Sequence, residues 1–246
     1  MVEAEVAGAG FINFTVSKDI FHKTILEIIN NKGYFENNHG QGQKVLIEFV
    51  SANPTGPLHI GHGRGAAYGD SLAKVLSVSG YKVKKEYYVN DAGNQMNNLA
   101  LSVYSRIEEI KGIDTEFPEN GYHGDYIKDI AESVLKENKN ILEKDKDKAL
   151  EICLTKAVEI IKGLIEKDLK DFRVEFDSWF SEKSLYKNGD VEKTLKTLKD
   201  LGQTYEKDSA LWLYTENKGD DKDRVLKKST GEYTYFAPDI AYHLNK

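Results

Sequence analysis

Apolar residues recur along this chain with a period that changes from segment to segment, and each change predicts an element. Residues 18–31 place large apolar side chains three or four positions apart, which is typical of an amphipathic helix. Residues 1–17 instead carry apolar side chains around Gly8 and Gly10, so we expect a strand beside a glycine turn. The segment 36–43 is polar and predicts a linker.

Strands and helices alternate in the next part of the chain. The apolar run at 45–50 predicts a buried strand, and the run at 82–89 predicts a second one. Between them, residues 60–79 have helical spacing with small side chains on one face, which allows close packing against a sheet. Two strands joined through one helix form a right-handed βαβ unit, so we predict an α/β fold with a parallel sheet.

A helical block interrupts this alternation, and strand-like pieces return after it. Three segments carry apolar residues at helical spacing, at 95–111, 124–143 and 147–171. The later strand-like pieces lie at 174–176, 210–214, 225–226 and 233–236. Two further helices are expected, one over 190–201 and one that begins at Pro238 and Asp239.

The composition limits the class of protein. Of the 246 residues, 40% are hydrophobic and 30% are charged, which is typical of a globular chain. We find neither an apolar stretch of the ~20 residues that cross a bilayer nor a secretory leader pattern. The single Cys153 excludes an internal disulfide, so we expect a cytoplasmic protein with no membrane partner. The net charge of −6 argues against a protein that mainly coats nucleic acid, although a local basic patch is still compatible with it.

The segment after the first predicted strand carries the chemistry. Its eleven residues are Ala52-Asn53-Pro54-Thr55-Gly56-Pro57-Leu58-His59-Ile60-Gly61-His62. The prolines stiffen the turn, and the helix that follows offers unpaired N–H groups to an anion. His59 and His62 are three apart, so both project from one side of the first helical turn and can donate to a phosphate. Gly61 has no side chain, so a flat ring can lie against its backbone.

Two other interpretations of this segment are open. In one, the histidines are solvated residues at a helix start. In the other, Gly61, Gly63 and Ala66 belong to a dinucleotide-binding fingerprint. Ten residues separate the strand from the first of these glycines, however, and no acidic residue clearly closes the second strand. The P-loop pattern does not occur in the sequence.

The same segment resembles a known family. Residues 47–65 closely resemble the signature region of the arginyl-tRNA synthetases, which are class I aminoacyl-tRNA ligases. Further segments resemble this family in the same order, so that the similarity extends over essentially the whole chain. These segments are 86–95, 176–179, 220–225 and 233–243, while residues 6–14 resemble the end of the family's N-terminal tRNA-contacting domain.

The resemblance implies a fold and a division into domains. The expected fold is α/β, with the Rossmann-like parallel sheet of class I synthetases, incomplete here, and a helical insertion over about 95–172. Residues 1–40 would be a remnant of the N-terminal tRNA-contacting domain plus a linker helix. Residues 41–246 would be the first part of the catalytic domain.

The resemblance also implies a reaction. L-arginine would be activated by ATP to arginyl-adenylate and then transferred to the 3′ end of tRNA(Arg). His59 and His62 would be the catalytic residues and would contact the ATP phosphates, and Thr55 and Gly61 would also bind ATP. Mg²⁺ would arrive with ATP, so we expect no metal site made by the protein alone.

Arginine recognition makes its own physical demand. A guanidinium is a planar fork of five donors that stays charged, so it calls for carboxylates and a hydroxyl. In the resemblance, Asp239 and Tyr235 are the pair that reads it. The other positions that match arginine-binding residues of the family are Glu48, Ser51, Asn53 and Glu182. Purely structural roles are the alternatives, namely a helix start for Asp239, a strand core for Tyr235 and a surface acid for Glu182.

One departure from the family bears on activity. The family has a Lys-Met-Ser-Lys-like loop whose lysines stabilise the pyrophosphate end of ATP, and no such run occurs in this sequence. We therefore expect a truncated chain that is inactive alone. The alternatives are a noncatalytic module that binds arginine or a nucleotide, and a small adenylyltransferase with a similar His-x-Gly-His turn. A reading frame that continues past Lys246 to the missing loop would favour the ligase.

Overall fold

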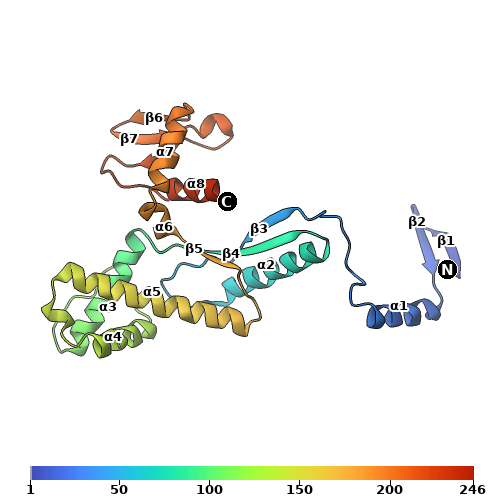
Figure 1. Cartoon of the computed structure of the whole chain (residues 1–246), viewed down its shortest axis with the longest axis horizontal. Coiled ribbons are helices and arrows are strands. Elements are labelled where there is room, and N and C mark those ends of the chain that lie inside the picture. Colours follow the sequence, from blue (N-terminus) through green and yellow to red (C-terminus); the bar gives the residue numbers. More distant parts are fainter. Residues whose placement is uncertain (1) are drawn as a thin grey trace. The chain divides into compact units, whose positions relative to one another are not determined.

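The computed structural model describes residues 2–246 and divides into two compact units. Unit 1 comprises Met1–Val45 and Lys74–Lys82, and unit 2 comprises Leu46–Ala73 and Val83–Lys246. Figure 1 labels the elements of both. None of the helices formed by residues 2–246 combines the length and the apolar character that a membrane span requires.

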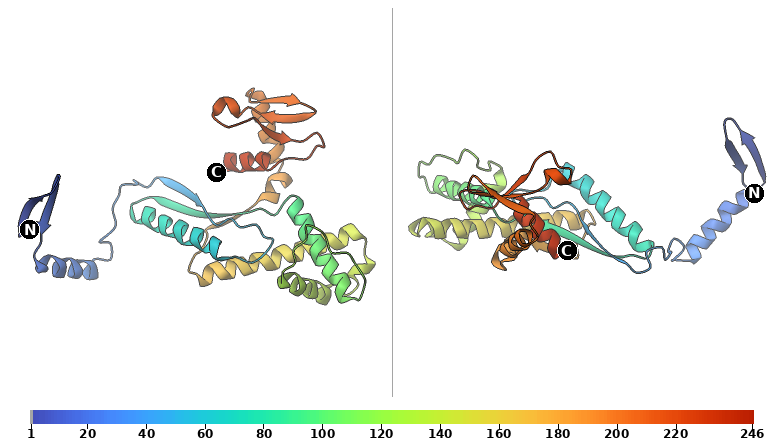
Figure 2. Two further views of the ribbon diagram at one scale, coloured as in Figure 1. Left: turned by 180° about the vertical axis from the view of Figure 1, so that it is seen from behind. Right: turned by 90° about the horizontal axis from the view of Figure 1, so that it is seen from above.

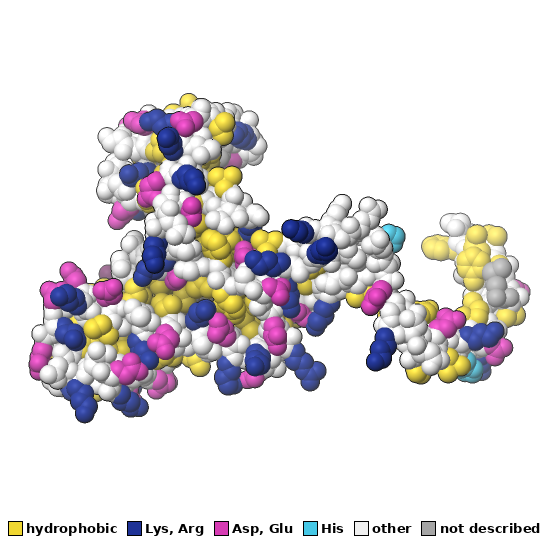
Figure 3. Space-filling view, viewed as in Figure 1, with side chains coloured by type: hydrophobic (Ala, Val, Ile, Leu, Met, Phe, Trp, Pro, Cys, Tyr) yellow, Lys and Arg dark blue, Asp and Glu magenta, His cyan; other side chains and the backbone are white. Residues whose placement is uncertain are grey.

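Unit 1 contains a hairpin and a helix with exposed apolar faces. Strands β1 (Glu3–Ala7) and β2 (Phe11–Thr15) pair antiparallel, where the sequence predicted a single strand. Gly8 and Gly10 adopt φ values of 57° and 95° between the strands, which reverses the chain. Helix α1 (Lys18–Asn30) confirms the prediction for 18–31. The large apolar residues of these elements are exposed and show as yellow side chains in Figure 3.

The linker 36–43 contains turns and neither helix nor strand, as its polarity predicts. It is nevertheless tightly packed within unit 1. Gly40 donates its N–H to the Ser79 carbonyl at 2.8 Å, and a Cβ added to Gly40 would lie 2.5 Å from the Tyr81 ring. Only a glycine fits this close approach.

A three-stranded sheet positions the chemistry-bearing residues. Its strand order is β3 (Lys44–Glu48), β4 (Lys82–Val89) and β5 (Ser178–Ser181). Strands β4 and β5 run parallel, with Tyr87 opposite Trp179. Helix α2 (Ile60–Val78) connects β3 to β4, which confirms the predicted strand–helix–strand order. Its small-residue face also packs as predicted, because a Cβ on Gly69 would meet the Phe49 ring at 2.2 Å.

The strand predicted at 174–176 is wrong. Val174 donates its N–H to the Leu169 carbonyl at 2.8 Å, so the chain is still leaving the preceding helix there. Strand β5 starts only after Asp177, whose N–H binds the Lys85 carbonyl at 2.9 Å. Val174 and Phe176 are apolar because they pack in the core from a loop. A short apolar run does not distinguish such a loop from a strand.

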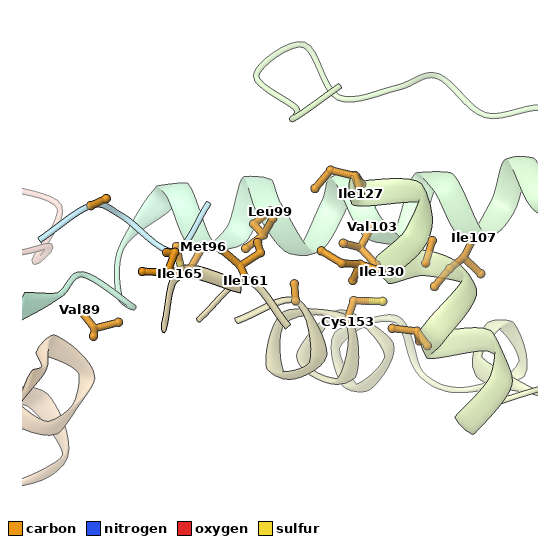
Figure 4. Packing of buried hydrophobic residues seen from close by; sticks show 14 of the residues in the cluster. Val89, Met96, Leu99, Val103, Ile107, Ile127, Ile130, Cys153, Ile161 and Ile165 are labelled. Atoms are coloured by element: carbon orange, nitrogen blue, oxygen red, sulfur yellow. The ribbon is translucent and has the colours of Figure 1, made fainter. Parts of the chain in front are cut away.

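The helical block confirms the first and third predicted segments, whereas the second, predicted over 124–143, ends as an α-helix at Glu137. It consists of α3 (Asn94–Ile110), α4 (Asp125–Glu137), a short 3₁₀ turn (Ile141–Glu143) and α5 (Lys146–Asp171). The Asp145 carboxylate accepts the N–H groups of Asp147 and Lys148 at 3.2 and 3.4 Å, so a local cap starts α5. The apolar stripes of the three helices meet in one core, and Figure 4 labels ten of its residues.

A second module of unit 2 follows β5, and Figure 2 shows it from two further directions. Its elements are α6 (Glu182–Lys187), α7 (Asp190–Asp200), β6 (Thr204–Lys207), β7 (Ala210–Leu213), a 3₁₀ turn (Glu216–Lys218), β8 (Arg224–Lys227) and α8 (Phe236–Asn245). Strands β6, β7 and β8 form an antiparallel sheet whose leucines pack against α7 and α8. The sequence did not predict α6 or β6.

The strand predicted at 233–236 is also wrong. Tyr233 pairs with Lys227 through a single isolated bridge, and α8 already begins at Phe236. Pro238 therefore lies in the first turn of the helix, where its missing N–H costs no intrahelical bond. The predicted helix exists, but it starts two residues earlier than Pro238 suggested.

Candidate functional site

Two stacked histidines mark the turn that enters α2. The ring centroids of His59 and His62 lie 3.7 Å apart at 28°. His62 Nδ1 accepts the His59 N–H at 3.2 Å, and His59 Nδ1 accepts the Gly61 N–H at 3.1 Å. Each ring thus uses Nδ1 as an acceptor, which leaves Nε2 to carry the proton and to donate to a ligand.

The surroundings of His62 favour its neutral form. Burial lowers the pKa of His62 below its ordinary value of 6.5, and the charge of His59 lowers it further. An anion bound beside the rings would oppose both effects and raise the pKa of His62. A glycine is needed between them, because a Cβ on Gly61 would lie 2.9 Å from the His59 ring.

A groove of about 390 Å³ lies in front of the histidines. Its lining residues are Ala52, Asn53, Thr55, Gly56, Pro57, His59, His62, Tyr122 and Tyr126. The Tyr126 hydroxyl donates to the Thr55 carbonyl at 2.6 Å, which fixes the turn against the helical block. Sequence reasoning missed both tyrosines, since nothing local connects them with the histidine turn.

The chain takes a strained path where β3 ends. Val50 and Ser51 have φ values of 66° and 42°, although neither is a glycine. Such conformations cost about 1–3 kcal/mol each and concentrate at functional sites. The kink brings the Ser51 hydroxyl to the Glu48 carboxylate, to which it donates at 2.9 Å, and the Tyr88 N–H donates to the same hydroxyl at 3.1 Å. Two predicted arginine-binding residues are thereby joined.

Glu182 is a buried carboxylate, so the alternative of a surface acid is wrong. Its relative exposure is 6%, and the Tyr186 hydroxyl donates to it at 3.4 Å. Burial raises the pKa of Glu182, and the negative charge of Asp239 raises it further. A buried carboxylate with a like charge nearby is poised to receive a cation.

Tyr88 contributes an unusual buried hydroxyl to the same region. The residue is 8% exposed, and its hydroxyl has no hydrogen-bond partner among residues 2–246. Burial raises the pKa of Tyr88, and the nearby charge of Glu182 adds to the shift. This hydroxyl also interacts with the Glu182 carboxylate, although the two groups do not reach the geometry of a full hydrogen bond, so it is incompletely satisfied.

Asp239 lies in the first turn of α8, as the structural alternative for it predicted. Burial raises the pKa of Asp239, the charge of Glu48 also raises it, and His243 opposes both. Three acidic side chains, Glu48, Glu182 and Asp239, therefore interact electrostatically although they come from distant parts of the chain.

Tyr235 does not join this cluster in the described arrangement. It caps α8, is 66% exposed and lies against the Phe236 ring at 4.4 Å. The alternative of a strand core residue is therefore wrong. Asn53 is held elsewhere, because its side-chain amide group donates to Gln95 Oε1 at 2.8 Å. Its side-chain Oδ1 is left as an acceptor.

A network of residues that sequence reasoning missed surrounds the acids. Lys246 donates to Glu48 Oε2 at 3.0 Å and lies 4.2 Å from the Tyr242 ring centroid. The Tyr242 hydroxyl in turn donates to Glu86 Oε1 at 2.8 Å. Within residues 2–246, no three His, Cys, Asp or Glu side chains gather closely enough to hold a metal ion.

Known proteins resemble this chain in sequence. A family model described as the catalytic domain of class I (R) tRNA synthetases matches residues 24–246. The chain is 54% identical over 243 residues to the arginine–tRNA ligase of Oleidesulfovibrio alaskensis, covering 98% of this chain and 44% of that protein. It is 50% identical over 246 residues to the arginine–tRNA ligase of Oceanobacillus iheyensis, covering 99% of this chain and 44% of that one. The chain thus spans less than half the length of these relatives.

A solved structure also resembles this chain. It is a crystal structure from Campylobacter jejuni described as an arginyl-tRNA synthetase, with a TM-score of 0.82 and 37% sequence identity. The match covers 94% of this chain and 51% of that one. The Thermus thermophilus arginyl-tRNA synthetase has the same fold, with a TM-score of 0.64 at 24% identity over 99% of this chain and 41% of that chain.

Proposed function

The chain belongs to the catalytic-domain family of the class I arginyl-tRNA synthetases, and from that premise we propose that it forms part of a site for arginine activation. The complete reaction joins L-arginine and ATP to arginyl-adenylate and pyrophosphate, and then transfers arginine to the 3′ end of tRNA(Arg). The observation that carries the proposal is the group of carboxylates at Glu48, Glu182 and Asp239, which lies beside an unsatisfied tyrosine hydroxyl.

Arginine fits this group because it supplies what the acids lack. The pKa values of Glu182 and Asp239 are raised mainly by burial, with a contribution from neighbouring negative charge. A guanidinium neutralises that charge and offers several N–H donors, one of which can donate to the Tyr88 hydroxyl oxygen. A neutral isostere would leave the Glu182 carboxylate buried without a cation, which would give selectivity for arginine. Tyr235 would have to turn inward from the surface to contribute its hydroxyl.

The α-amino end of arginine would be held at the end of β3. Glu48 already accepts one ammonium group in this chain, that of Lys246 at 3.0 Å. Ser51 orients Glu48 through its hydroxyl, and the side-chain Oδ1 of Asn53 adds a further acceptor. Such fixed acceptors around an ammonium are the usual way in which a protein holds an α-amino group.

ATP would lie along the histidine turn. The phosphate oxygens would accept hydrogen bonds from the Nε2–H groups of His59 and His62, and these donors would offset the negative charge that develops in the transition state. Thr55 lies in the lining of the same groove, and the backbone at Gly61 would face the adenine. Mg²⁺ would enter with ATP, bound mainly by its phosphates.

The remaining assignments follow the same family. We propose tRNA(Arg) as a partner and the cytoplasm as the location. We also propose that residues 1–40 are a remnant of the tRNA-contacting domain and that residues 41–246 are the first part of the catalytic domain. The helical insertion lies at about 95–172 in this division. Without lysines for the pyrophosphate end, the 246-residue chain alone should not support ATP–pyrophosphate exchange.

Calorimetric titration of the chain with L-arginine tests the proposal. Asp239→Asn removes one charge from the acid cluster without changing its shape, so we expect about tenfold weaker binding or more. Asp129→Asn is the matched control, because Asp129 is an exposed acid on α4. Equal affinities for wild type and Asp239→Asn, or no binding by the wild type, would remove the acid cluster from arginine recognition.

A further inference from the structure

One buried carboxylate links α8 to the three-stranded sheet. Glu86 lies on β4 and is 5% exposed. The Ser178 hydroxyl of β5 donates to Glu86 Oε2 at 2.6 Å. The Tyr242 hydroxyl of α8 donates to Glu86 Oε1 at 2.8 Å, although these two residues are 156 positions apart in the sequence. Helix α8 is thereby anchored to a strand that lies far from it along the chain.

The Glu86 carboxylate is held in its ionised form. Burial raises the pKa of Glu86, but the hydrogen bonds from Ser178 and Tyr242 lower it. The charges of Lys84 and Lys246 lower it further, so the pKa lies below its ordinary value of 4.5. A hydrogen bond to an ionised acceptor is about twice as strong as one between neutral groups. The anchor is therefore a strong bond at one defined point on α8.

The Tyr242 side chain reaches all three strands of the sheet. It is 3% exposed, and its ring packs on Tyr88 of β4 and Phe180 of β5 at centroid distances of 4.5 and 4.8 Å. The Lys246 ammonium lies 4.2 Å from the centroid of this ring and donates to Glu48 of β3. A change in the seat of Tyr242 would therefore be felt on both sides of the proposed arginine site.

Asp239 is carried by the same helix. It precedes Tyr242 by three residues, which places both side chains on one side of α8. Burial raises the pKa of Asp239, and the charge of Glu48 raises it as well, so Asp239 lies near enough to β3 to sense that charge. If α8 moved away from the sheet, Asp239 would become more hydrated and would lie farther from Glu48.

We propose that Glu86 is a positioning residue for the arginine site, because its bond to Tyr242 fixes α8 on the sheet. Asp239 of α8 and Glu48 of the sheet are proposed to hold opposite ends of one arginine, so their separation must match its length. Glu86 acts through α8 and does not touch the substrate, since protein hydroxyls bind both of its oxygens. The inference rests on the proposed function, which supplies the ligand that needs these acids at a fixed separation.

Tyr242→Phe tests the inference in the 246-residue chain, because it removes the hydroxyl and keeps the ring. We expect this variant to bind L-arginine about tenfold more weakly in calorimetry. In an NMR titration of chains labelled with ¹³C at the aspartate carboxyls, the raised pKa of Asp239 should fall toward its ordinary value of 3.8, because the carboxylate becomes less buried. Asp239→Asn identifies the signal. The matched control is Tyr205→Phe, which removes a bond of 2.9 Å to the Asp223 carboxylate and should change neither quantity.

A double variant separates positioning from stability. In Glu86→Leu, Tyr242→Phe both partners become apolar groups of similar shape, which is nearly neutral for folding. The midpoint of urea denaturation should therefore return toward the wild-type value, while L-arginine still binds about tenfold more weakly. Recovery of arginine affinity together with stability would show that the bond is only structural and would overturn the inference.

Two other results would also overturn it. One is a Tyr242→Phe variant whose arginine affinity and Asp239 pKa are unchanged, and the other is a Tyr205→Phe variant with the same losses as Tyr242→Phe. A wild-type chain that binds no arginine would instead contradict the proposed function. The NMR comparison needs no ligand, so it still decides in that case whether Tyr242 and Glu86 hold Asp239 in place.

Discussion

Replacing Tyr88 with phenylalanine should stabilise this chain. The Tyr88 hydroxyl is buried and approaches Glu182 without reaching the geometry of a full hydrogen bond, and an unsatisfied buried hydroxyl costs about 1–3 kcal/mol. Tyr88→Phe removes that cost and keeps the ring, which packs on Tyr242 at a centroid distance of 4.5 Å. For a chain of this size, the gain corresponds to a rise in Tm of about 2–10 °C.

The neighbouring tyrosine provides the matched control. Tyr87 lies on the same strand, and its hydroxyl donates to the Ala52 carbonyl at 2.9 Å. Tyr87→Phe breaks this bond and leaves a buried carbonyl unpaired, so it should destabilise the chain by about 1–3 kcal/mol. The same chemical change on adjacent residues should therefore have opposite signs.

Urea denaturation followed by far-UV circular dichroism measures both effects. With L-arginine present, the stability advantage of Tyr88→Phe should shrink, because this variant also removes a hydroxyl that we expect the ligand to use and should weaken its binding about three- to tenfold. The reasoning is refuted if Tyr88→Phe lowers the free energy of unfolding, or if both variants shift it in the same direction.

Two further predictions concern α2. The folded-state pKa of His62 is lowered, so the stability from the neutral ring is present above pH 6.5 and is lost as the pH falls through the folded pKa. Bound ATP should raise this pKa, as an NMR titration of the imidazole would show, and an unchanged pKa would place the phosphates elsewhere. Gly69→Ala should cost about 1–3 kcal/mol because its Cβ overlaps Phe49. Gly163→Ala on α5, with nothing within 4 Å of an added Cβ, should instead stabilise by about 0.5–1 kcal/mol, and equal effects in urea denaturation would contradict this account.

Local patterns predicted most of the helices. The segments that became α1, α3, α4 and α5 could be recognised because a helical stripe repeats several times within one element. The histidine turn was equally visible, since its prolines, glycine and two histidines are adjacent in the sequence.

Short strands were less predictable. The run at 174–176 is apolar because it packs in the core from a loop, and the run at 233–236 is apolar because it leads into a helix. Strand β6 has too few apolar residues to stand out. In these places the environment that a residue meets in the fold decides its conformation, and a few residues carry too little periodicity to reveal it.

The sequence by itself determined most of the helices, the Pro/Gly turn that carries the two histidines, and the kinds of side chain available for the proposed cationic substrate. Tertiary structure decided which of those side chains act together. Glu48, Glu182 and Asp239 approach one another only after β3, α6 and α8 have packed, and their burial is what raises the pKa values of Glu182 and Asp239. A groove of the second module likewise combines Lys196 and Lys199 of α7 with Lys227 of β8, which are apart in the sequence. Periodicity is a local property, whereas charge coupling and desolvation depend on distances in space.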